Sequence, residues 1–256
     1  DIRSFTSLSE KMTPQELVDF LNDFFKRMTA PISQNKGFVD KFIGDCVMAL
    51  FSIPAEPNDT DALNSVMAAI GMQEQIDSFN VDNNRSGDNL LRVGVGIHSG
   101  PVIIGTVGSE ERMESTVTGD TVNLAARLEG LTKFYRSKIL ISQTTHDLIQ
   151  PESNIEFREL DLVQVKGKDE PVTIFEVCNS DPEPTREQKL GSREKFAEAL
   201  INYRAQKWTA ATTNFKSCLK DCPADAAAAL YLERCKIFKK TPPPKDWKGE
   251  QVFTQK

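Results

Sequence analysis

Two short apolar runs meet at a Gly-Asp pair between residues 37 and 51 (GFVDKFIGDCVMALF). Runs of this kind predict a buried β-hairpin that turns at Gly44-Asp45. Two charged residues interrupt the apolar pattern: Asp45 lies at the turn, and Lys41 lies four positions before it. On a strand these two positions share a face and lie roughly 13 Å apart, at about 3.3 Å per residue. Because charges on an apolar element are costly without partners, Asp45 is either a solvated turn residue or a functional carboxylate.

Apolar periodicity over the rest of the N-terminal two-thirds predicts helices and strands in mixed order. A capping box from Thr13 to Glu16, with Pro14 at the first helical position, begins a helix whose apolar stripe reaches Met28. This order predicts an α+β fold with antiparallel pairing. The further expected elements are a loop at 54–59, a helix at 61–79, strands at 91–97 and 101–107, a charged loop at 108–112, a helix at 121–134, a strand at 138–142, a short helix at 144–149, and strands at 155–165 and 171–177.

The C-terminal third changes to a helical pattern. A polar segment at 179–191, with two prolines, is typical of a linker. Residues 192–240 then predict helices, and the tail at 241–256 is rich in proline at its start and carries Trp247 and Phe253 as anchors. Residues 208–223 match the second half of a tetratricopeptide repeat, although a plain helical hairpin fits as well. Since one repeat is too short to stand alone, these helices must pack on the preceding domain or on a partner protein.

Composition narrows the function classes. The chain has 256 residues, of which 39% are hydrophobic and 27% charged, as in a soluble globular protein with a medium domain and a smaller one. A net charge of −6 without a basic run argues against a nucleic-acid partner. The five cysteines, an odd number at irregular spacing, indicate reduced thiols. The pair Cys218 and Cys222 lacks an accompanying histidine, which disfavours a metal site there.

Three groups of polar residues suggest nucleotide chemistry. Asp1 and Asp45 are candidate ligands for Mg²⁺, which prefers oxygen donors and completes its shell with phosphates. The backbone amides of residues 2–6 open a turn toward a helix, where phosphate oxygens bind well. Asn123 and Arg127 share one face of a predicted helix and suit a sugar oxygen and a phosphate. A surface arginine beside a helical asparagine is the plainer alternative.

The blocks DIRSFT, KFIGDCVMALF and STVTGDTVNLAARLEG occur in this order, and with them residues 1–177 resemble the class III nucleotide cyclase catalytic domain. The resemblance implies a ferredoxin-like βαββαβ core with an antiparallel sheet. It also implies a first strand that ends at Asp1, so we expect that strand to be cut from this sequence. Residues 1–178 are therefore expected to form the cyclase domain.

The resemblance assigns a role to each matching residue. Asp1 and Asp45 match the aspartates that bind two Mg²⁺ or Mn²⁺ ions per site, and the Ile2 carbonyl often joins them. Asn123 matches the residue that orients the ribose, and Arg127 the one that stabilises the α-phosphate. Further phosphate contacts are expected from Ser4, Phe5, Thr6, Arg112 and Lys166.

Lys41 and Thr116 match the two positions that read the base. A lysine can only donate, which fits N1 of adenine, and the threonine hydroxyl can accept from the adenine amino group. Guanylyl cyclases are expected to carry a carboxylate at the position of Lys41. The resemblance therefore implies an adenylyl cyclase that makes cyclic AMP and pyrophosphate from ATP, by in-line attack of the ribose 3′-oxygen on the α-phosphorus with two metal ions. A guanylyl cyclase and a nucleotide-binding regulatory module without turnover are the alternatives.

The resemblance also implies partners and a setting. Active members are head-to-tail homodimers, in which one protomer supplies the metal ligands and the other supplies the base, ribose and α-phosphate contacts. The threonine at position 116 resembles a subclass, common in bacteria, that is often stimulated by bicarbonate. The tail resembles the ends of some bacterial membrane-anchored sensor cyclases. We therefore expect a cytoplasmic catalytic end of a longer membrane-anchored protein in signal transduction, with C-terminal helices available to a protein partner.

Overall fold

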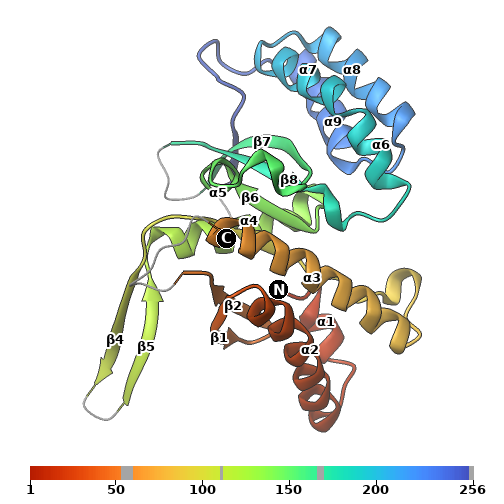
Figure 1. The fold of residues 1–256 in the computed structure, drawn as a ribbon. Helices are drawn as coiled ribbons and strands as arrows, with labels where there is room; N and C mark the ends of the chain where they lie inside the picture. Colours follow the sequence, from red (N-terminus) through yellow and green to blue (C-terminus); the bar gives the residue numbers. More distant parts are fainter. Residues whose placement is uncertain (53–59, 110–111, 166–169, 254–256) are drawn as a thin grey trace.

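The computed structural model describes residues 1–52, 60–109, 112–165 and 170–253. The loop expected at 54–59 and Lys166 therefore lie outside the described residues. A mixed sheet of five strands forms the centre of the fold (Figure 1). β3 pairs with β6 and β7 pairs with β9 in parallel, whereas the pairs β6–β8 and β7–β8 are antiparallel. The strand order is β3 (Val95–Ile97), β6 (Ile139–Ser142), β8 (Val172–Val177), β7 (Phe157–Val165) and β9 (Gln251–Phe253).

Long helices cover opposite faces of this sheet. In β6, Ile139 and Ile141 are buried against apolar residues of α3 (Asp61–Asp82). Leu140 points the other way and is buried with residues of α4 (Asp120–Tyr135). This alternation is the period of two that a strand imposes on its side chains. The α+β class expected from the sequence is confirmed, with two parallel pairings added to the antiparallel ones.

Two hairpins stand apart from the central sheet. β1 (Phe38–Ile43) and β2 (Cys46–Leu50) turn at Gly44-Asp45 as expected, with Gly44 at a φ of 62°. β4 (Ile103–Ser109) and β5 (Arg112–Thr118) form a second hairpin that projects from the body (Figure 1). The predicted bounds of the charged loop, 108–112, were therefore wrong at both ends. The antiparallel ladder between β4 and β5 reaches as far as the pair Ser109–Arg112.

The expectation that the β1–β2 hairpin is buried was also wrong, because β2 is half-buried and β1 is half-buried to exposed. One side of the hairpin packs on α2 (Pro14–Gln34), where the rings of Phe25 and Phe42 stack at 4.0 Å. Ile43 is nonetheless 58% exposed and Phe42 46% exposed, because no described element covers the outer side of β1. Apolar strand residues left open in this way are candidates for contact with another molecule.

The remaining elements of the first 180 residues are short, apart from α2. The capping box predicted at Thr13 is present, since Thr13 and Glu16 exchange hydrogen bonds there. The strand predicted at 91–97 is confined to β3, with a single bridge between Ile2 and Val93 before it. The other short elements are α1 (Phe5–Ser9), α5 (Gln143–Asp147), η1 (Gly87–Asn89), η2 (Pro151–Ser153) and η3 (Cys178–Ser180).

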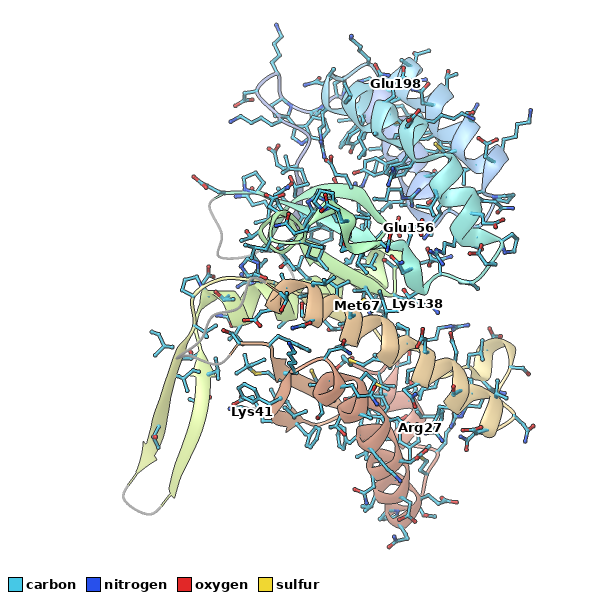
Figure 2. The ribbon with its side chains drawn as sticks, in the orientation of Figure 1. Arg27, Lys41, Met67, Lys138, Glu156 and Glu198 are labelled. Carbon is cyan, nitrogen blue, oxygen red and sulfur yellow. The ribbon has the colours of Figure 1, made fainter. Side chains whose placement is uncertain are left out.

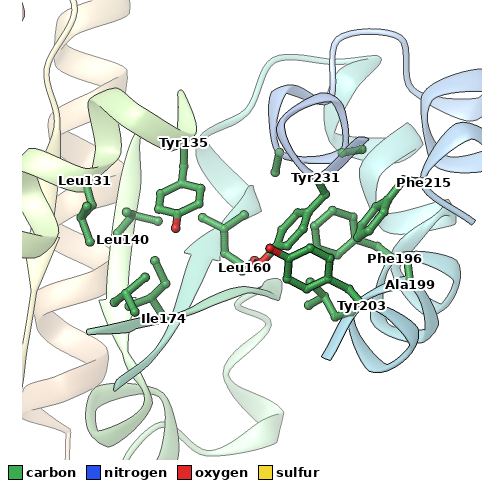
Figure 3. Close-up of a cluster of buried hydrophobic side chains, with 14 of the residues drawn as sticks. Leu131, Tyr135, Leu140, Leu160, Ile174, Phe196, Ala199, Tyr203, Phe215 and Tyr231 are labelled. Atoms are coloured by element: carbon green, nitrogen blue, oxygen red, sulfur yellow. Dashed lines mark hydrogen bonds between the residues drawn. The ribbon is translucent and has the colours of Figure 1, made fainter. Parts of the chain in front are cut away.

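The C-terminal helices share one hydrophobic core with the sheet. Figure 3 shows Leu160 of β7 between Tyr135 of α4 and the aromatic rings of the C-terminal helices, among them Tyr203 and Tyr231. Residues 185–191, which the sequence predicted as part of a linker, form a helix, and the side chain of Lys189 within it is buried. The helices are α6 (Thr185–Gly191), α7 (Arg193–Arg204), α8 (Trp208–Asp221) and α9 (Ala226–Lys240).

All five cysteines are free, which agrees with the expectation of reduced thiols.

In the described part of the chain, no helix has the length and apolar character needed to cross a membrane.

A buried ionic network joins the central sheet to the C-terminal helices α6 and α9. The Arg158 guanidinium of β7 donates to Glu176 of β8 and makes two hydrogen bonds to Asp225, the residue that caps α9. Lys189 of α6 donates to Glu176 at 3.0 Å and to Asp181 at 2.7 Å. Burial alone would raise the pKa of Glu176, but the charges of Arg158 and Lys189 lower it to about 2. The carboxylate therefore stays ionised inside the protein.

This network predicts an acid-sensitive contribution to stability. Because the folded pKa of Glu176 lies below its usual value of 4.5, its contribution is present above about pH 4.5 and is lost as the pH falls toward 2. The wild-type free energy of unfolding should therefore drop over this range by on the order of 3 kcal/mol more than that of Glu176→Gln. Urea unfolding at a series of pH values measures the difference. Parallel pH profiles for the two proteins would contradict the role of Glu176.

Candidate active site

Asp45 and the start of the chain come together although they are far apart in sequence. The Asp45 carboxylate accepts a hydrogen bond from the Ile2 amide, with Oδ2 and N 3.0 Å apart. Ile2 is itself fixed, because its side chain is buried and it bridges Val93. The Asp1 carbonyl accepts from the Gly94 amide at 3.0 Å. The carboxylate at the hairpin turn is thus held beside the peptide that joins Asp1 to Ile2.

The turn after Ile2 leads into helix α1. Ser4 adopts a left-handed backbone conformation with a φ of 57° and immediately precedes the helix. Ser4 and Thr6 are exposed and Phe5 is half-buried. The backbone of residues 4–6 therefore follows closely after Ile2, the residue that contacts Asp45, at a point where the chain turns sharply.

Lys41 and Thr116 meet across two hairpins. The Lys41 ammonium donates to the Thr116 hydroxyl, with Nζ and Oγ1 2.8 Å apart. The Asp40 carboxylate lies 3.3 Å from the same ammonium. Figure 2 shows Lys41 on the β1–β2 hairpin, on the side that faces β4 and β5. The two residues expected to read the base are therefore direct neighbours within one chain.

Helix α4 carries the third group. Asn123 is exposed near the start of the helix, and Arg127 follows one turn later and is half-buried. The Nη1 atom of Arg127 is buried without a hydrogen-bond partner among the described residues. A buried guanidinium nitrogen without an acceptor is costly, and a bound oxyanion would supply that acceptor.

Two residues that the sequence analysis did not single out set the position of α4. Gly96 of β3 lets the helix approach closely, since a Cβ at Gly96 would lie 2.2 Å from the Glu129 backbone nitrogen and 2.3 Å from the Ala125 carbonyl oxygen. Arg3 forms an ion pair of 2.9 Å with Glu129. The alternation of glycine and apolar residues in VGVGI was the available signal for the close approach. The pairing of Arg3, by contrast, joins residues too distant in sequence for any pattern to indicate.

Two expected phosphate contacts are not placed by the structure. Arg112 begins strand β5, and its side chain is not among the described ones. Lys166 lies outside the described residues.

The sequence profile of the adenylate and guanylate cyclase catalytic domain matches residues 1–177, which include the three groups above. The chain belongs to this family. An adenylate cyclase of Anabaena cylindrica is 46% identical to it over 183 residues, which cover 69% of this chain and 35% of that protein. The terminal-differentiation specific adenylate cyclase of Dictyostelium discoideum is 39% identical over 236 residues, which cover 92% of this chain and 11% of that protein. The chain thus spans only a minor part of the length of both relatives.

Solved structures of the cyclase family agree with the fold. The crystal structure of the adenylyl cyclase CyaB from P. aeruginosa matches with a TM-score of 0.62 and 35% identity, covering 69% of this chain and 89% of that one. Guanylyl cyclases are also among the matching relatives and structures. Family membership alone therefore leaves the choice between ATP and GTP to the residues of the site.

The oxygen donors of the site fit a divalent metal ion, on which cyclases of this family generally depend. Asp1 and Asp45 would hold it, because the Asp45 carboxylate is hydrogen-bonded to the amide of Ile2, the residue that directly follows Asp1. In the ranges that the structure describes, no group of three or more histidine, cysteine or acidic side chains gathers in a metal-binding arrangement. Two carboxylates leave most of an octahedral shell open, which suits Mg²⁺ completed by substrate phosphates and water.

The close packing at Gly96 predicts a sensitive position for cyclase activity. Gly96→Ala should push α4 away from β3, because the added Cβ meets helix backbone that cannot rotate aside. We expect a loss of roughly 1–3 kcal/mol in unfolding free energy and lower activity per folded molecule. Gly130→Ala, on the same helix with nothing within 4 Å of the added Cβ, is the matched control. Thermal unfolding and cyclic nucleotide formation measure both effects, and equal behaviour of the two variants would contradict the packing argument.

Proposed function

We propose that this chain is the catalytic unit of an adenylyl cyclase that converts ATP to 3′,5′-cyclic AMP and pyrophosphate. The observation that carries the proposal is the contact between Lys41 and Thr116, within a domain of the cyclase family. The adenylate cyclases of Anabaena and Dictyostelium, which are the relatives compared above, support the same substrate.

The hydrogen-bonding capacity of these two side chains favours adenine over guanine. Adenine offers N1 as an acceptor and its amino group as a donor, while guanine offers the reverse pattern at the corresponding positions. The Lys41 ammonium can only donate, and the Thr116 hydroxyl can accept once the lysine turns to the base. The hydroxyl can also donate, so we expect weaker discrimination than a carboxylate would give. For GTP, by contrast, Lys41 would face a donor, which disfavours a guanylyl cyclase.

The other groups would hold the sugar and the phosphates. Asp1, Asp45 and the Ile2 carbonyl would bind two Mg²⁺ or Mn²⁺ ions, which when bound make the ribose 3′-hydroxyl more acidic and neutralise phosphate charge. The amides of residues 4–6, with Arg112 and Lys166, would hold the β- and γ-phosphates. Asn123 would orient the ribose so that its 3′-oxygen is in line with the α-phosphorus. The free nitrogen of Arg127 would stabilise the charge that develops on the α-phosphate as pyrophosphate leaves.

We further propose that the active form is a head-to-tail homodimer with composite sites. The exposed apolar residues of the two hairpins support a protein interface, since Phe42 and Ile43 of β1 and Ile103 and Ile104 of β4 are each at least 44% exposed. The projecting β4–β5 hairpin (Figure 1) provides a surface that reaches beyond its own domain. In such a dimer the metal-binding Asp45 of one protomer would face the base-binding Lys41 and the phosphate-binding Arg127 of the other.

Helices α7 to α9 would form a single tetratricopeptide-like unit, which packs on the cyclase sheet as a lone repeat must. Residues 1–178 and 192–240 would then be the two parts of the chain, with a helical connection at 179–191 and an anchoring tail after 240. The outer surface of the tetratricopeptide-like unit would remain open to a protein partner. Thr116 also favours the subclass that bicarbonate often stimulates, so activity assays should include bicarbonate as a variable.

Composite sites predict complementation between two inactive variants. Asp45→Asn and Arg127→Ala should each lower cyclic AMP formation by about 100-fold or more, because each removes charge stabilisation worth several kcal/mol. Asp88→Asn, in the exposed 3-10 helix η1, is the control and should keep full activity. A mixture of the two inactive variants should recover about a quarter of wild-type activity, since random pairing leaves one intact site in each mixed dimer. No recovery after mixing and refolding together would contradict the composite site.

The base contact predicts a change of substrate preference. Lys41→Glu replaces a donor with an acceptor, so cyclic AMP formation should fall by at least about tenfold, the value of one charge-assisted hydrogen bond, while the ratio of GTP to ATP turnover rises. Lys26→Glu, an exposed lysine on α2, reverses a charge outside the site and should change neither. Product formation from ATP and GTP, with Mg²⁺ or Mn²⁺ and with or without bicarbonate, measures this. Wild-type protein that makes cyclic GMP faster than cyclic AMP would overturn the adenylyl assignment.

A further inference from the structure

Helix α4 ends in a cluster of buried polar side chains, one of which comes from the C-terminal helices. The Tyr135 hydroxyl, at the last residue of α4, donates to the Asp161 carboxylate of β7. Arg234 of α9 donates to the same carboxylate and lies 3.4 Å from the Tyr135 hydroxyl oxygen through its second nitrogen. All three side chains are at most 7% exposed. The end of α4 is therefore tied to a residue that lies about a hundred positions further along the chain.

The C-terminal strand holds the same end of α4 from a second direction. β9 pairs in parallel with β7, with Phe253 opposite Val165. The Phe253 ring packs edge-on against Phe134 at 5.1 Å and against Tyr135 at 6.4 Å. Such aromatic pairs are worth about 0.5–1.5 kcal/mol beyond the area they bury.

The segment before β9 is anchored as well. The Trp247 ring lies among the rings of Tyr203, Trp208 and Phe238, with centroids 5.2–5.9 Å apart. Its indole nitrogen donates to the Glu250 carbonyl at 2.9 Å. The path from α9 to β9 is thus fixed at both ends, so that Arg234 and Phe253 contact α4 from one connected structure.

These contacts bear on the catalytic half of the same helix. Arg127 precedes Tyr135 by eight residues, or about 12 Å of helix at 1.5 Å per residue. Because Nη1 of Arg127 has no partner in the described chain, the position of the guanidinium depends on where the helix lies. The Arg3–Glu129 ion pair holds the middle of α4, and the C-terminal structure holds its end.

We infer that helix α9 and strand β9 form a clamp on the end of α4 that positions Arg127 for catalysis. Arg234 and Phe253 are then positioning residues, and the chain beyond residue 177 is a functional part of the cyclase. The inference rests on the role of Arg127 given under the proposed function. The similarity to the Dictyostelium cyclase agrees with it, because that alignment covers more of the chain than the family profile does.

The expected effect of loosening the clamp is on turnover rather than on substrate binding. Arg127 acts on charge that develops in the transition state, and a displacement of about 1 Å in a positioned group can cost 10²-fold in rate. Phe253→Ala should therefore lower kcat for cyclic AMP formation by about tenfold, while KM for ATP changes by less than about twofold. Val252→Ala, the neighbouring position with 51% exposure, is the matched control and should keep wild-type values. Phe253→Tyr keeps the ring and should retain most of the activity.

A double-mutant cycle decides whether the clamp works through Arg127. Arg127→Ala, Phe253→Ala and the combined variant are compared at equal folded fraction, which thermal unfolding verifies. If Phe253→Ala lowers kcat in the wild type but adds nothing in the Arg127→Ala background, the clamp is supported. If the two effects multiply, or if Phe253→Ala leaves kcat unchanged while Arg127→Ala abolishes it, the clamp is overturned and the proposed function stands. If Arg127→Ala itself leaves kcat unchanged, the catalytic role of Arg127 fails, and the clamp fails with it.

Arg234 gives a second test that avoids an unfolded variant. Arg234→Met would leave the buried Asp161 carboxylate without a cation, with the Tyr135 hydroxyl and the Leu162 amide as its remaining donors, which is costly. Arg234→Lys, by contrast, keeps the charge but not the two-point contact. Arg234→Lys should speed hydrogen exchange of amides at the C-terminal end of α4 and lower kcat several-fold, with KM for ATP unchanged. Lys195→Arg, in an exposed ion pair with Asp221 of α8, is the control. Unchanged exchange and unchanged kcat in Arg234→Lys would overturn the assignment of Arg234.

Discussion

The structure depends on acidic side chains that are buried in the central sheet and paired with cations. Asp161 of β7 and Glu176 of β8 are almost fully buried, and a buried charge is costly unless it is paired and hydrogen-bonded. Arg158 of the sheet itself pairs with Glu176. Each of the two carboxyl groups also takes a cation from the C-terminal helices, which is Lys189 of α6 for Glu176 and Arg234 of α9 for Asp161. Without the C-terminal helices, both side chains would lose these cations and Asp161 and Glu176 would become more exposed to solvent. The sheet and the C-terminal helices therefore stabilise each other through these ion pairs and the core they share.

This dependence changes how the parts of the chain should be understood. The family profile ends at residue 177, but one hydrophobic core runs from α4 through β7 to α9. The Arg158 side chain, stacked over the Phe196 ring at 4.1 Å and bound to Asp225, lies in the middle of this shared core. A sequence boundary at this point is thus not a boundary in packing. Any change transmitted to the C-terminal helices would reach the end of α4 without crossing a flexible joint.

Much of the local structure could be predicted from the sequence, because it follows from local rules. The Gly44 turn, the capping box at Thr13 and the extent of α4 depend on backbone preference and apolar period alone. The helix at 185–191 was missed because its polar sequence resembles a linker. The residue that it buries is itself charged, since Lys189 pairs with Glu176 and Asp181. The strand ends at Ser109 and Arg112 were missed for a similar reason, since a charged stretch can still pair when its partner strand lies opposite.

The site residues required more than local rules. Periodicity alone could not bring Lys41 to Thr116 or Asp45 to Ile2, because those contacts span 75 and 43 positions. The family resemblance named these residues, and the structure shows which of them touch. It also shows that Gly96 and Arg3 set the position of α4. Contacts of this kind depend on how two elements pack, which no single segment encodes.

The β1–β2 hairpin makes two separate contacts from one small element. Asp45 at the turn contacts the start of the chain, while Lys41 contacts β5. The two contacts are separate because Lys41 lies within β1, whereas Asp45 lies in the turn beyond the end of that strand. The outer side of β1 stays apolar and exposed between these two contacts. If a second protomer covers that side, each hairpin contributes its carboxylate to one site and its lysine to the other. Movement of one hairpin would then change both sites together.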